Sequence, residues 1–466
     1  MKFLPAASLV ALAVAGCTAG PDYHVPEHAM ANAPAARGAF AAGHEAAYDP
    51  APLPNHWWRL YDDPRLDGYV TEALAANTDL RAADANLKRA TFVVREAETG
   101  RLPVTTLSAT GGVARLQGST ERLPGSAVYS LGGSIAYPLD LAGGIRRGIE
   151  AARDDAEATR AARDQVRVTV AAAVTRSYAA ACSANRTLAA TQRVLDIQRQ
   201  TLDVTQRLFK GGRGTAFDVT RAQAAVDQSA AAIPSIIAGR QAALFELAAL
   251  MGRAPADYPR ELESCPAPPE LKRLLPIGDG AALIRRRADV RAAERSLAAA
   301  TATVGVETAR LYPQVSLGGS AGFGGPLSAI GTGSQFSLSA GPLLTWTFPN
   351  RAVAHARIGE AGAAAETASA QFDGTVIGAL QQTETALSAY AREIDRDRDL
   401  TRARDDSAKA TDQANRLFRF GRTSFVDVLT AQSNLADAEA ALAASEAELI
   451  DRQIDVFLAL GGGWET

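Results

Sequence analysis

Two aspartates occupy matching positions in a stretch that the chain contains twice. Arg207–Gln223 reads RLFKGGRGTAFDVTRAQ and Arg416–Gln432 reads RLFRFGRTSFVDVLTAQ, so nine of the seventeen residues are identical. The identical residues include Gly212, Arg213 and Asp218 in the first copy and Gly421, Arg422 and Asp427 in the second. Each aspartate follows a Thr or Ser by three residues, which is the spacing of a capping box. Each glycine can adopt the positive φ that ends a helix. The stretch therefore predicts a tight turn between two helices.

A second pattern, Gly318-Gly-Ser320-Ala-Gly322, fits the nucleophile elbow of serine hydrolases. That chemistry needs a strand–turn–helix setting together with an acid and a histidine. Here the pattern lies within a run of alternating residues, and His355 is the only histidine in the second half of the chain. The five histidines and three cysteines show no metal-ligand spacing. We therefore expect no catalytic residue, no metal site and no cofactor beyond a covalent lipid.

That lipid is expected on Cys17. Lys2 is followed by a short apolar run, and Val14-Ala-Gly-Cys17 then matches the lipobox of bacterial lipoprotein signal peptides. Residues 1–16 would be removed and the thiol of Cys17 acylated, although an ordinary signal peptide remains the alternative. Thr18 is not an aspartate, and in such lipoproteins this resembles an outer-membrane address. Cys182 and Cys265 could form a disulfide outside the cytoplasm, but two separate thiols are the expectation.

Charge and hydropathy exclude several classes of protein. The 466-residue chain has a formal net charge of −3, and no basic run is longer than Arg285–Arg287, so we expect no nucleic-acid partner. Beyond the N-terminus no apolar run reaches the ~18 residues that a membrane-spanning helix needs. If the chain crosses a membrane, it must do so with strands.

Four segments alternate between apolar residues and small polar ones. They are Val104–Leu116, Tyr129–Asp140, Val315–Phe323 and Phe336–Phe348. Strands of about 10 residues with one apolar and one uncharged polar face are typical of transmembrane barrels. Four strands cannot close a barrel, because the smallest single-chain barrels have about eight. Several copies must combine, giving eight strands in a dimer or twelve in a trimer.

Long helices are expected between the strands. Gly144–Phe209 and Asn350–Phe418 contain no proline, and returning helices follow at Thr215–Met251 and Ser424–Leu460, the first with a kink expected at Pro234. Heptad-spaced apolar residues indicate coiled-coil seams. Before these helices, residues 17–56 suggest an extended tether. Trp57-Trp58 is expected to anchor the folded body. The apolar stripe that follows predicts one helix to about Thr99. The fold class is mixed and mainly α, with an internal duplication into residues 57–270 and 271–466 and turns near 210–218 and 419–427.

Several motifs together resemble a known family. These are the lipobox followed by Gly20-Pro-Asp-Tyr23, the Trp57-Trp58 segment, Asn77-Thr-Asp-Leu80, Arg287-Ala-Asp-Val290 and the doubled turn. They resemble the TolC-like outer-membrane factors, in particular the lipoprotein branch that serves tripartite efflux pumps. The resemblance implies a homotrimer with a twelve-stranded barrel in the bacterial outer membrane, continuing into a periplasmic tunnel of helical hairpins. It also implies a periplasmic adaptor and an inner-membrane pump of the resistance-nodulation-division type as partners, with drugs or other small toxic compounds as cargo.

The resemblance also gives the two turns a role at the periplasmic tip, where the tunnel closes and partners dock. Asp427 falls where the family places a pore-narrowing carboxylate, while Thr430 stands where a second acidic ring would require Asp. Thr423 replaces the expected basic residue, and Arg422 is the nearest candidate for that role. Two other functions stay open: the exit duct of a type I protein secretion system, and a scaffold lipoprotein that does not conduct.

Overall fold

The described part of the chain forms two compact units. The computed structural model describes residues 18–114, 126–265, 267–346 and 351–462. The first unit contains the described residues within the ranges 1–27, 86–160 and 292–372. The second unit contains the described residues within 28–85, 161–291 and 373–466. Both units draw on both halves of the sequence, and each is described by itself.

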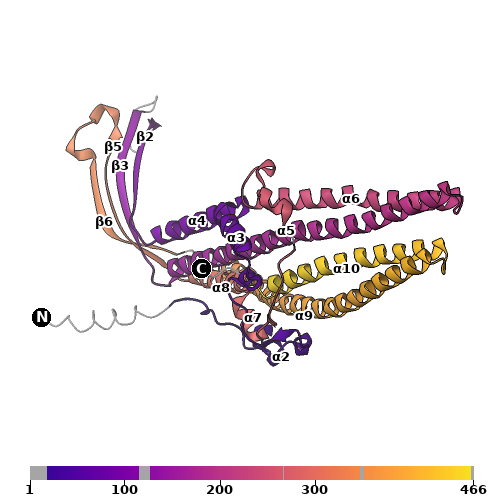
Figure 1. Ribbon diagram of the computed structural model, residues 1–466. Coiled ribbons are helices and arrows are strands. Elements are labelled where there is room, and N and C mark those ends of the chain that lie inside the picture. Colours follow the sequence, from indigo (N-terminus) through magenta and orange to yellow (C-terminus); the bar gives the residue numbers. More distant parts are fainter. Residues whose placement is uncertain (1–17, 115–125, 266, 347–350, 463–466) are drawn as a thin grey trace. The chain divides into compact units, whose positions relative to one another are not determined.

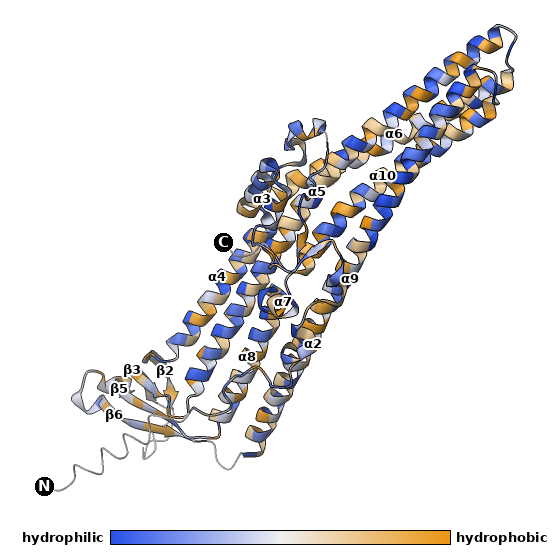
Figure 2. Cartoon of the chain, turned by 60° about the horizontal axis from the view of Figure 1, so that its bottom comes forward, coloured by the Kyte–Doolittle hydropathy of each residue, from blue (hydrophilic) through white to orange (hydrophobic). Residues whose placement is uncertain are grey.

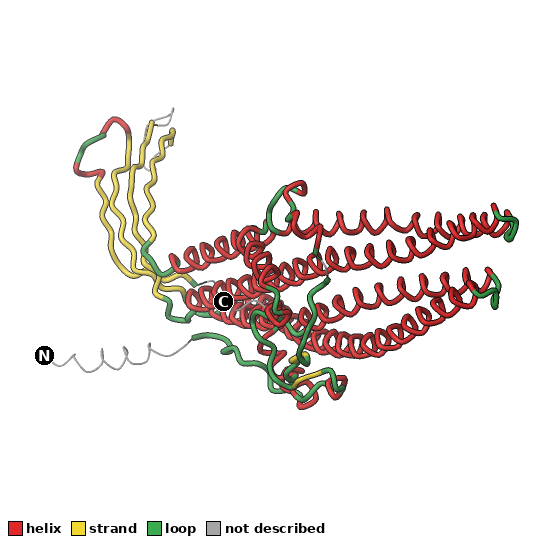
Figure 3. The backbone as a smooth tube through the Cα atoms, in the orientation of Figure 1, coloured by secondary structure: helices red, strands yellow, loops and turns green. Residues whose placement is uncertain are grey.

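The first unit contains one antiparallel sheet of four strands (Figure 3). The strands are β2 (Val104–Ala114), β3 (Ser126–Leu139), β5 (Gln314–Pro326) and β6 (Phe336–Thr345), paired in the order β2-β3-β5-β6. The four predicted strands are therefore confirmed, with ends that differ by a few residues. Pro138 and Pro342 lie close to the ends of their strands, where the loss of a ladder donor matters least. The central β3–β5 pairing joins the first repeat to the second.

The chain forms two helical hairpins (Figure 1), and most of their residues belong to the second unit. In the first, α5 (Gly144–Lys210) turns into α6 (Ala216–Leu250). In the second, α9 (Arg351–Arg419) turns into α10 (Phe425–Ala459). The proline-free tracts thus form the expected long helices, and α6 continues through Pro234. Along these helices hydrophilic and hydrophobic residues alternate (Figure 2), which suits hairpins that pack on one side only.

The expected single helix up to Thr99 is wrong, because the structure has two. The helix α3 (Pro64–Ala76) ends at Asn77, and α4 (Thr78–Thr99) begins there. The Asn77 side chain accepts from the backbone N–H groups of Asp79 and Leu80 at 3.0 and 3.1 Å, which caps α4. The second repeat has the same break between α7 (Gly280–Arg286) and α8 (Ala288–Ala309). An apolar stripe continues across such a break, so the pattern alone hides it.

The core of the second unit forms around the aromatic pair that the sequence singled out. Trp57 is 0 % exposed, and its ring stacks on Phe457 of α10 at 4.5 Å between centroids. Trp58 is also buried and donates through Nε1 to Asp67 at 2.8 Å. Trp57 therefore packs against α10, the last helix among the described residues, which confirms the predicted anchor.

The expectation of an extended tether at residues 17–56 is wrong for its described part, since residues 18–56 lie against the folded body. Phe40, Tyr48 and Leu53 are buried in the core of the second unit. The strand β1 (Tyr48–Asp49) pairs in parallel with β4 (Leu275–Pro276), and α2 spans Pro34–Arg37. The remaining short elements are 3-10 helices at Met30–Asn32, Ala41–His44, Trp57–Tyr61, Pro255–Asp257, Arg260–Ser264, Leu327–Ala329 and Gly333–Gln335. A segment without helical or strand period can still bury single apolar side chains.

The expectation of two separate thiols is also wrong. Cys182 in α5 and Cys265, in the loop after α6, form a disulfide across 83 residues of sequence. Both residues are buried. The core brings the loop onto α5, and a separation in sequence carries no information about this distance.

Among the described residues one helix, α6, is long and apolar enough to cross a membrane by length and composition. From the sequence we expected no apolar helix of this length beyond the N-terminus. The first part of α6 carries the charged residues Asp218, Arg221 and Asp227. We assign α6 to the hairpin with α5.

Candidate channel elements: the sheet and the hairpin turns

One face of the four-stranded sheet is apolar and uncovered. Leu131 of β3 lies opposite Phe323 of β5, which lies opposite Phe336 of β6. These side chains are 57 %, 44 % and 49 % exposed, and Leu107 on β2 reaches 90 %. Other exposed residues of this face are Ile135, Tyr137, Leu317, Leu338 and Leu344. A patch of this extent on a water-exposed surface would be unusual, so this face is built for an apolar environment.

The opposite face carries hydroxyl groups and no charge. Thr106, Ser134, Ser320 and Ser339 form one row across the four strands, because each is the register partner of the next. The hydroxyls of Ser320 and Ser339 lie 2.8 Å apart. A face of hydroxyls beside an apolar face gives the alternation of a barrel wall between lipid and water. Ser320 therefore lies inside a regular strand and not at the strand-to-helix turn that a nucleophile elbow requires.

The sheet has two outer strands. Among the described residues β2 pairs only with β3, and β6 pairs only with β5. The outer edges of β2 and β6 thus present backbone groups that need partners, and in hydrocarbon each unpaired group costs several kcal/mol. Strands from other copies of the chain would complete both edges.

The two turns have the same backbone. Gly212 and Gly421 adopt φ of +71° and +69°, in the left-handed region that other residues avoid. The next residue in each turn donates its backbone N–H back into the preceding helix, Arg213 to Leu208 O at 2.8 Å and Arg422 to Leu417 O at 2.9 Å. These bonds close the C-terminal end of α5 and of α9. The role predicted for both glycines as helix terminators is confirmed.

Both predicted capping boxes are present. Asp218 N–H donates to Thr215 Oγ1 at 3.1 Å, and Thr215 N–H donates to the Asp218 carboxylate at 3.2 Å. The corresponding distances between Asp427 and Ser424 are 3.2 and 3.0 Å. Each carboxylate thus stabilises the first turn of a returning helix, α6 or α10.

The turns differ in what surrounds the aspartate. Thr423 donates its hydroxyl to Asp427 at 2.7 Å, whereas the first turn has Gly214 at that position. Hydrogen bonds from Thr423, and then from Ser424, lower the pKa of Asp427 below its usual value. Arg213 and Arg422 are exposed, and the ion pairs of the described residues do not join either one to these aspartates. The structure therefore places Arg422 beside the turn without bringing its guanidinium onto the carboxylate.

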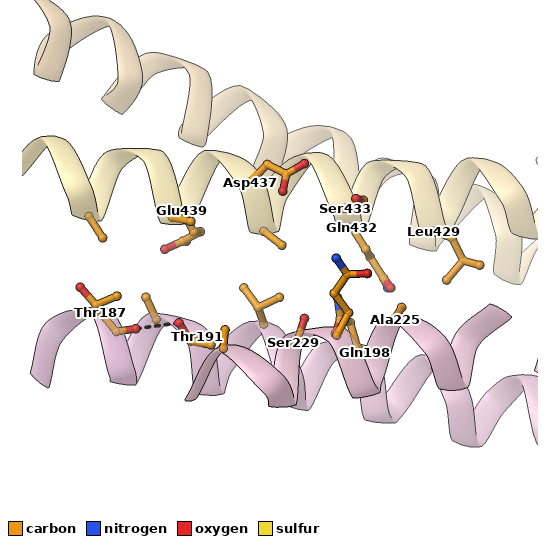
Figure 4. A pocket seen from close by; sticks show the side chains of 17 residues that line it. Thr187, Thr191, Gln198, Ala225, Ser229, Leu429, Gln432, Ser433, Asp437 and Glu439 are labelled. Atoms are coloured by element: carbon orange, nitrogen blue, oxygen red, sulfur yellow. Dashed lines mark hydrogen bonds between the residues drawn. The ribbon is translucent and has the colours of Figure 1, made fainter. Parts of the chain in front are cut away.

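A cavity of about 270 Å³ separates the two hairpins between α5, α6 and α10 (Figure 4). Its lining mixes apolar residues such as Val194 and Leu429 with polar ones such as Thr191, Ser229 and Asp437. Gln198 and Gln432 line it as well and are buried, and within the described part of the chain the side-chain oxygen of each has no hydrogen-bond partner. Water is the simplest group that could satisfy these oxygens.

Next to this cavity the hairpins are joined directly. Gln432 of α10 donates through Nε2 to Thr201 Oγ1 of α5 at 2.7 Å. Farther along, Arg176 of α5 pairs with Asp451 and Asp455 of α10 at 3.3 and 2.7 Å. Arg186 pairs in the same way with Glu446. Sequence reasoning missed these contacts, and the only available signal was that Gln432 belongs to the repeated stretch.

Cys17 lies outside the described residues. The structure begins at Thr18, which is the next residue along the chain.

A sheet with an apolar outer face, together with paired long hairpins, defines a subunit of an envelope channel. The family described as outer membrane efflux protein matches residues 69–253 and 281–462, one match in each repeat. The chain belongs to this family and is an outer-membrane efflux channel.

Individual proteins of known name are similar to this chain over nearly its whole length. Nodulation protein T of Rhizobium leguminosarum bv. trifolii is 28% identical over 455 residues, covering 97% of this chain and 96% of that protein. The probable efflux pump outer membrane protein TtgC of Pseudomonas putida is 26% identical over 475 residues, covering 99% and 96%. The structure of the outer-membrane channel OprN superposes with a TM-score of 0.88 at 35% identity, covering 96% of this chain and 100% of that chain.

Proposed function

We propose that three copies of this chain form a passive exit duct across the outer membrane for drugs or other small toxic compounds. The observation that carries the proposal is the four-stranded sheet, which has an exposed apolar face and, among the described residues, two outer edges without partners. Three such sheets supply twelve strands, which is wide enough for a pore, whereas eight strands would leave an interior filled by side chains. The uncharged hydroxyl face would then line the water-filled interior.

The assembly is tested by native mass spectrometry of the full chain in detergent. Three chains per particle are expected. A dimer, or a monomer that conducts ions, would contradict the strand count.

An inner-membrane pump and a periplasmic adaptor would deliver the cargo to the duct. Deleting the gene should sensitise cells to a panel of antibiotics, dyes and aromatic acids, and plasmid-borne wild type should restore resistance. Loss of a secreted protein with unchanged resistance would favour a type I secretion duct. No change in either export would favour a scaffold that does not conduct.

We further propose that Cys17 carries lipid as the mature N-terminus. The lipobox supports this role. In cells fed labelled fatty acid, the wild-type protein should be labelled and Cys17→Ala should not. Equal labelling of both proteins would overturn the assignment.

The two turns are proposed to form the periplasmic tip, with Asp427 near the threefold axis as the gate. Three carboxylates around one narrow opening would favour cations. Gly212 and Gly421 would shape the tip, while Asp218, Arg213 and Arg422 would flank it.

The gate is tested with three variants in planar bilayers. Asp427→Asn weakens both the cap and the charge ring, and it should reduce cation preference. Ser424→Ala weakens the cap but leaves the Asp427 carboxylate in place, and Asp218→Asn changes the other turn, so both should keep that preference at neutral pH. If Asp427→Asn folds and conducts like the wild type, Asp427 is only a helix cap.

A further inference from the structure

The first described residues are held tightly at the base of the sheet. Thr18 packs against Gly143, which lies in the loop between β3 and α5. A Cβ atom on Gly143 would come within 2.8 Å of Thr18 Cγ2. Ala19 N–H donates to Ala142 O at 2.9 Å. On the other side, a Cβ on Gly20 would lie 2.4 Å from the Cα of Gly305 in α8. Glycines at 143 and 305 thus provide the space through which the chain passes.

A buried arginine fixes the same segment. Arg147 of α5 is 3 % exposed and donates through Nε to Ala19 O at 3.2 Å. Its guanidinium also pairs with Asp22 and with Glu150. A guanidinium held on two carboxylates and a carbonyl has little freedom to move. The position of Thr18 is therefore set by the fold.

An open cavity of about 240 Å³ lies beside this position, between the ends of β3 and α8. Ala142, which binds Ala19, is one of its lining residues. The apolar side chains that line it include Leu139, Leu141, Ile145, Val306, Ala309 and Val315. It is smaller than the ~300–1,000 Å³ pockets that hold drug-sized ligands, and a single linear hydrocarbon chain needs less width than such a ligand.

The charged residues at the cavity have partners elsewhere. Asp140 accepts from the backbone N–H groups of Ile145 and Arg146 at 3.0 and 2.8 Å, so its carboxylate caps α5. Arg310 pairs with Glu307 at 3.1 Å. With these charges engaged, the side chains left to contact an occupant are mainly aliphatic.

We propose that this cavity receives an acyl chain of the lipid on Cys17. The inference rests on the proposed lipidation and adds a defined site for the chain. The occupant is indicated by where the described chain ends, which is one residue from Cys17 and hydrogen-bonded to the cavity rim. The clamp formed by Arg147, Asp22 and the two glycines then acts as a positioning device for the lipid. Acyl burial at this place ties the N-terminus to the junction between the membrane sheet and the helices.

The test uses the full-length protein in cells fed a fatty acid that carries a photoactivatable diazirine. After irradiation, cross-linked peptides are identified by mass spectrometry. The expected result is a covalent link between the acylated Cys17 peptide and peptides containing residues 138–145 or 306–315. An acylated Cys17 peptide with cross-links only to phospholipids or to other segments would overturn the pocket and leave lipidation intact. A Cys17 peptide without acyl groups would overturn lipidation and the pocket together.

The same experiment distinguishes a membrane lipid as the occupant. Cross-links at residues 138–145 that carry the mass of a phospholipid, and that persist in Cys17→Ala, would assign the cavity to the bilayer and contradict the proposal.

A matched pair of variants adds a second measurement. Val306→Trp fills the cavity, and the cross-link from Cys17 should be lost while Cys17 acylation is unchanged. Thr303→Trp places the same side chain at an exposed position of α8 outside the cavity, and the cross-link should remain. Equal cross-linking in both variants would contradict the site. If Val306→Trp fails to assemble, the mapping in the wild-type protein decides the question.

Discussion

The two hairpin turns have the same backbone conformation but differ in their side-chain contacts. Both have a left-handed glycine and a capping box at the same spacing. Gln432 of the second copy is 3 % exposed and bonds Thr201 on the other hairpin, whereas its counterpart Gln223 is exposed and bonds Asp227 on its own helix. Phe420 is 80 % exposed where the first turn has Gly211. Both copies thus keep the residues that end and start the helices, while Gln432 bonds the other hairpin and Phe420 exposes an aromatic ring, which their counterparts do not.

A disulfide bond is a further difference between the two hairpins. The Cys182–Cys265 disulfide closes α6 and the first turn into a ring with α5. No cysteine follows residue 265, so the second hairpin has no such restraint. The disulfide therefore restrains the first hairpin covalently. The second hairpin is held by hydrogen bonds and ion pairs, which can break reversibly.

The largest expected effect comes from removing the disulfide. The double variant Cys182→Ala/Cys265→Ala should lose about 4 kcal/mol of stability, since the bond closes a long loop. Denaturant unfolding followed by helical circular dichroism measures this loss. Hydrogen exchange should show the loss mainly in α6 and the loop after it. Equal loosening of α10 would contradict the proposed difference between the hairpins.

A smaller effect is expected at the shared glutamine. Gln432→Ala removes a buried hydrogen bond between hairpins and should cost about 1–3 kcal/mol. The matched change Gln223→Ala affects an exposed bond within one helix and should stay within about 0.5 kcal/mol. Native-state hydrogen exchange near Thr201 provides the readout. Similar exchange in the two variants would mean that Gln432 does not link the hairpins.

The caps should respond alike. Ser424→Ala and Thr215→Ala each remove one capping bond and should each cost about 1 kcal/mol in the first turn of the returning helix. Amide exchange at the start of α10 and of α6 tests this. A clearly larger loss of exchange protection in one turn would show that the two capping boxes do not stabilise their helices equally.

The smallest effect concerns the pKa of Asp427. Thr423→Gly gives the second turn the residue of the first, and it removes the largest cause of the lowered pKa. A lowered pKa stabilises the folded state above the ordinary aspartate value of about 3.9, and this contribution is lost as pH falls through the folded-state pKa. If Asp427 forms the proposed gate, cation preference in bilayers should disappear at a higher pH in Thr423→Gly than in the wild type, because the carboxylate is then protonated at a higher pH. An unchanged midpoint would argue against this role for Thr423.

Much of this architecture could be predicted because it depends on local patterns. Proline-free tracts, alternation in the strands and the spacing of Thr215 to Asp218 each reflect a short-range physical requirement. The docked N-terminal segment, the disulfide and the Gln432–Thr201 bond could not be predicted this way. They depend on which surfaces meet after the helices have formed, as when Phe40 and Tyr48 become buried in the core. The break at Asn77 was hidden for a related reason, since α3 and α4 share one apolar stripe.

Single-channel recording of the purified full-length protein in planar lipid bilayers tests the central claim most directly. If three chains complete a twelve-stranded barrel, the trimer should insert and produce discrete, reproducible conductance steps. A particle that is folded, trimeric and inserted, yet carries no ion current across a range of voltages and pH, would contradict the account.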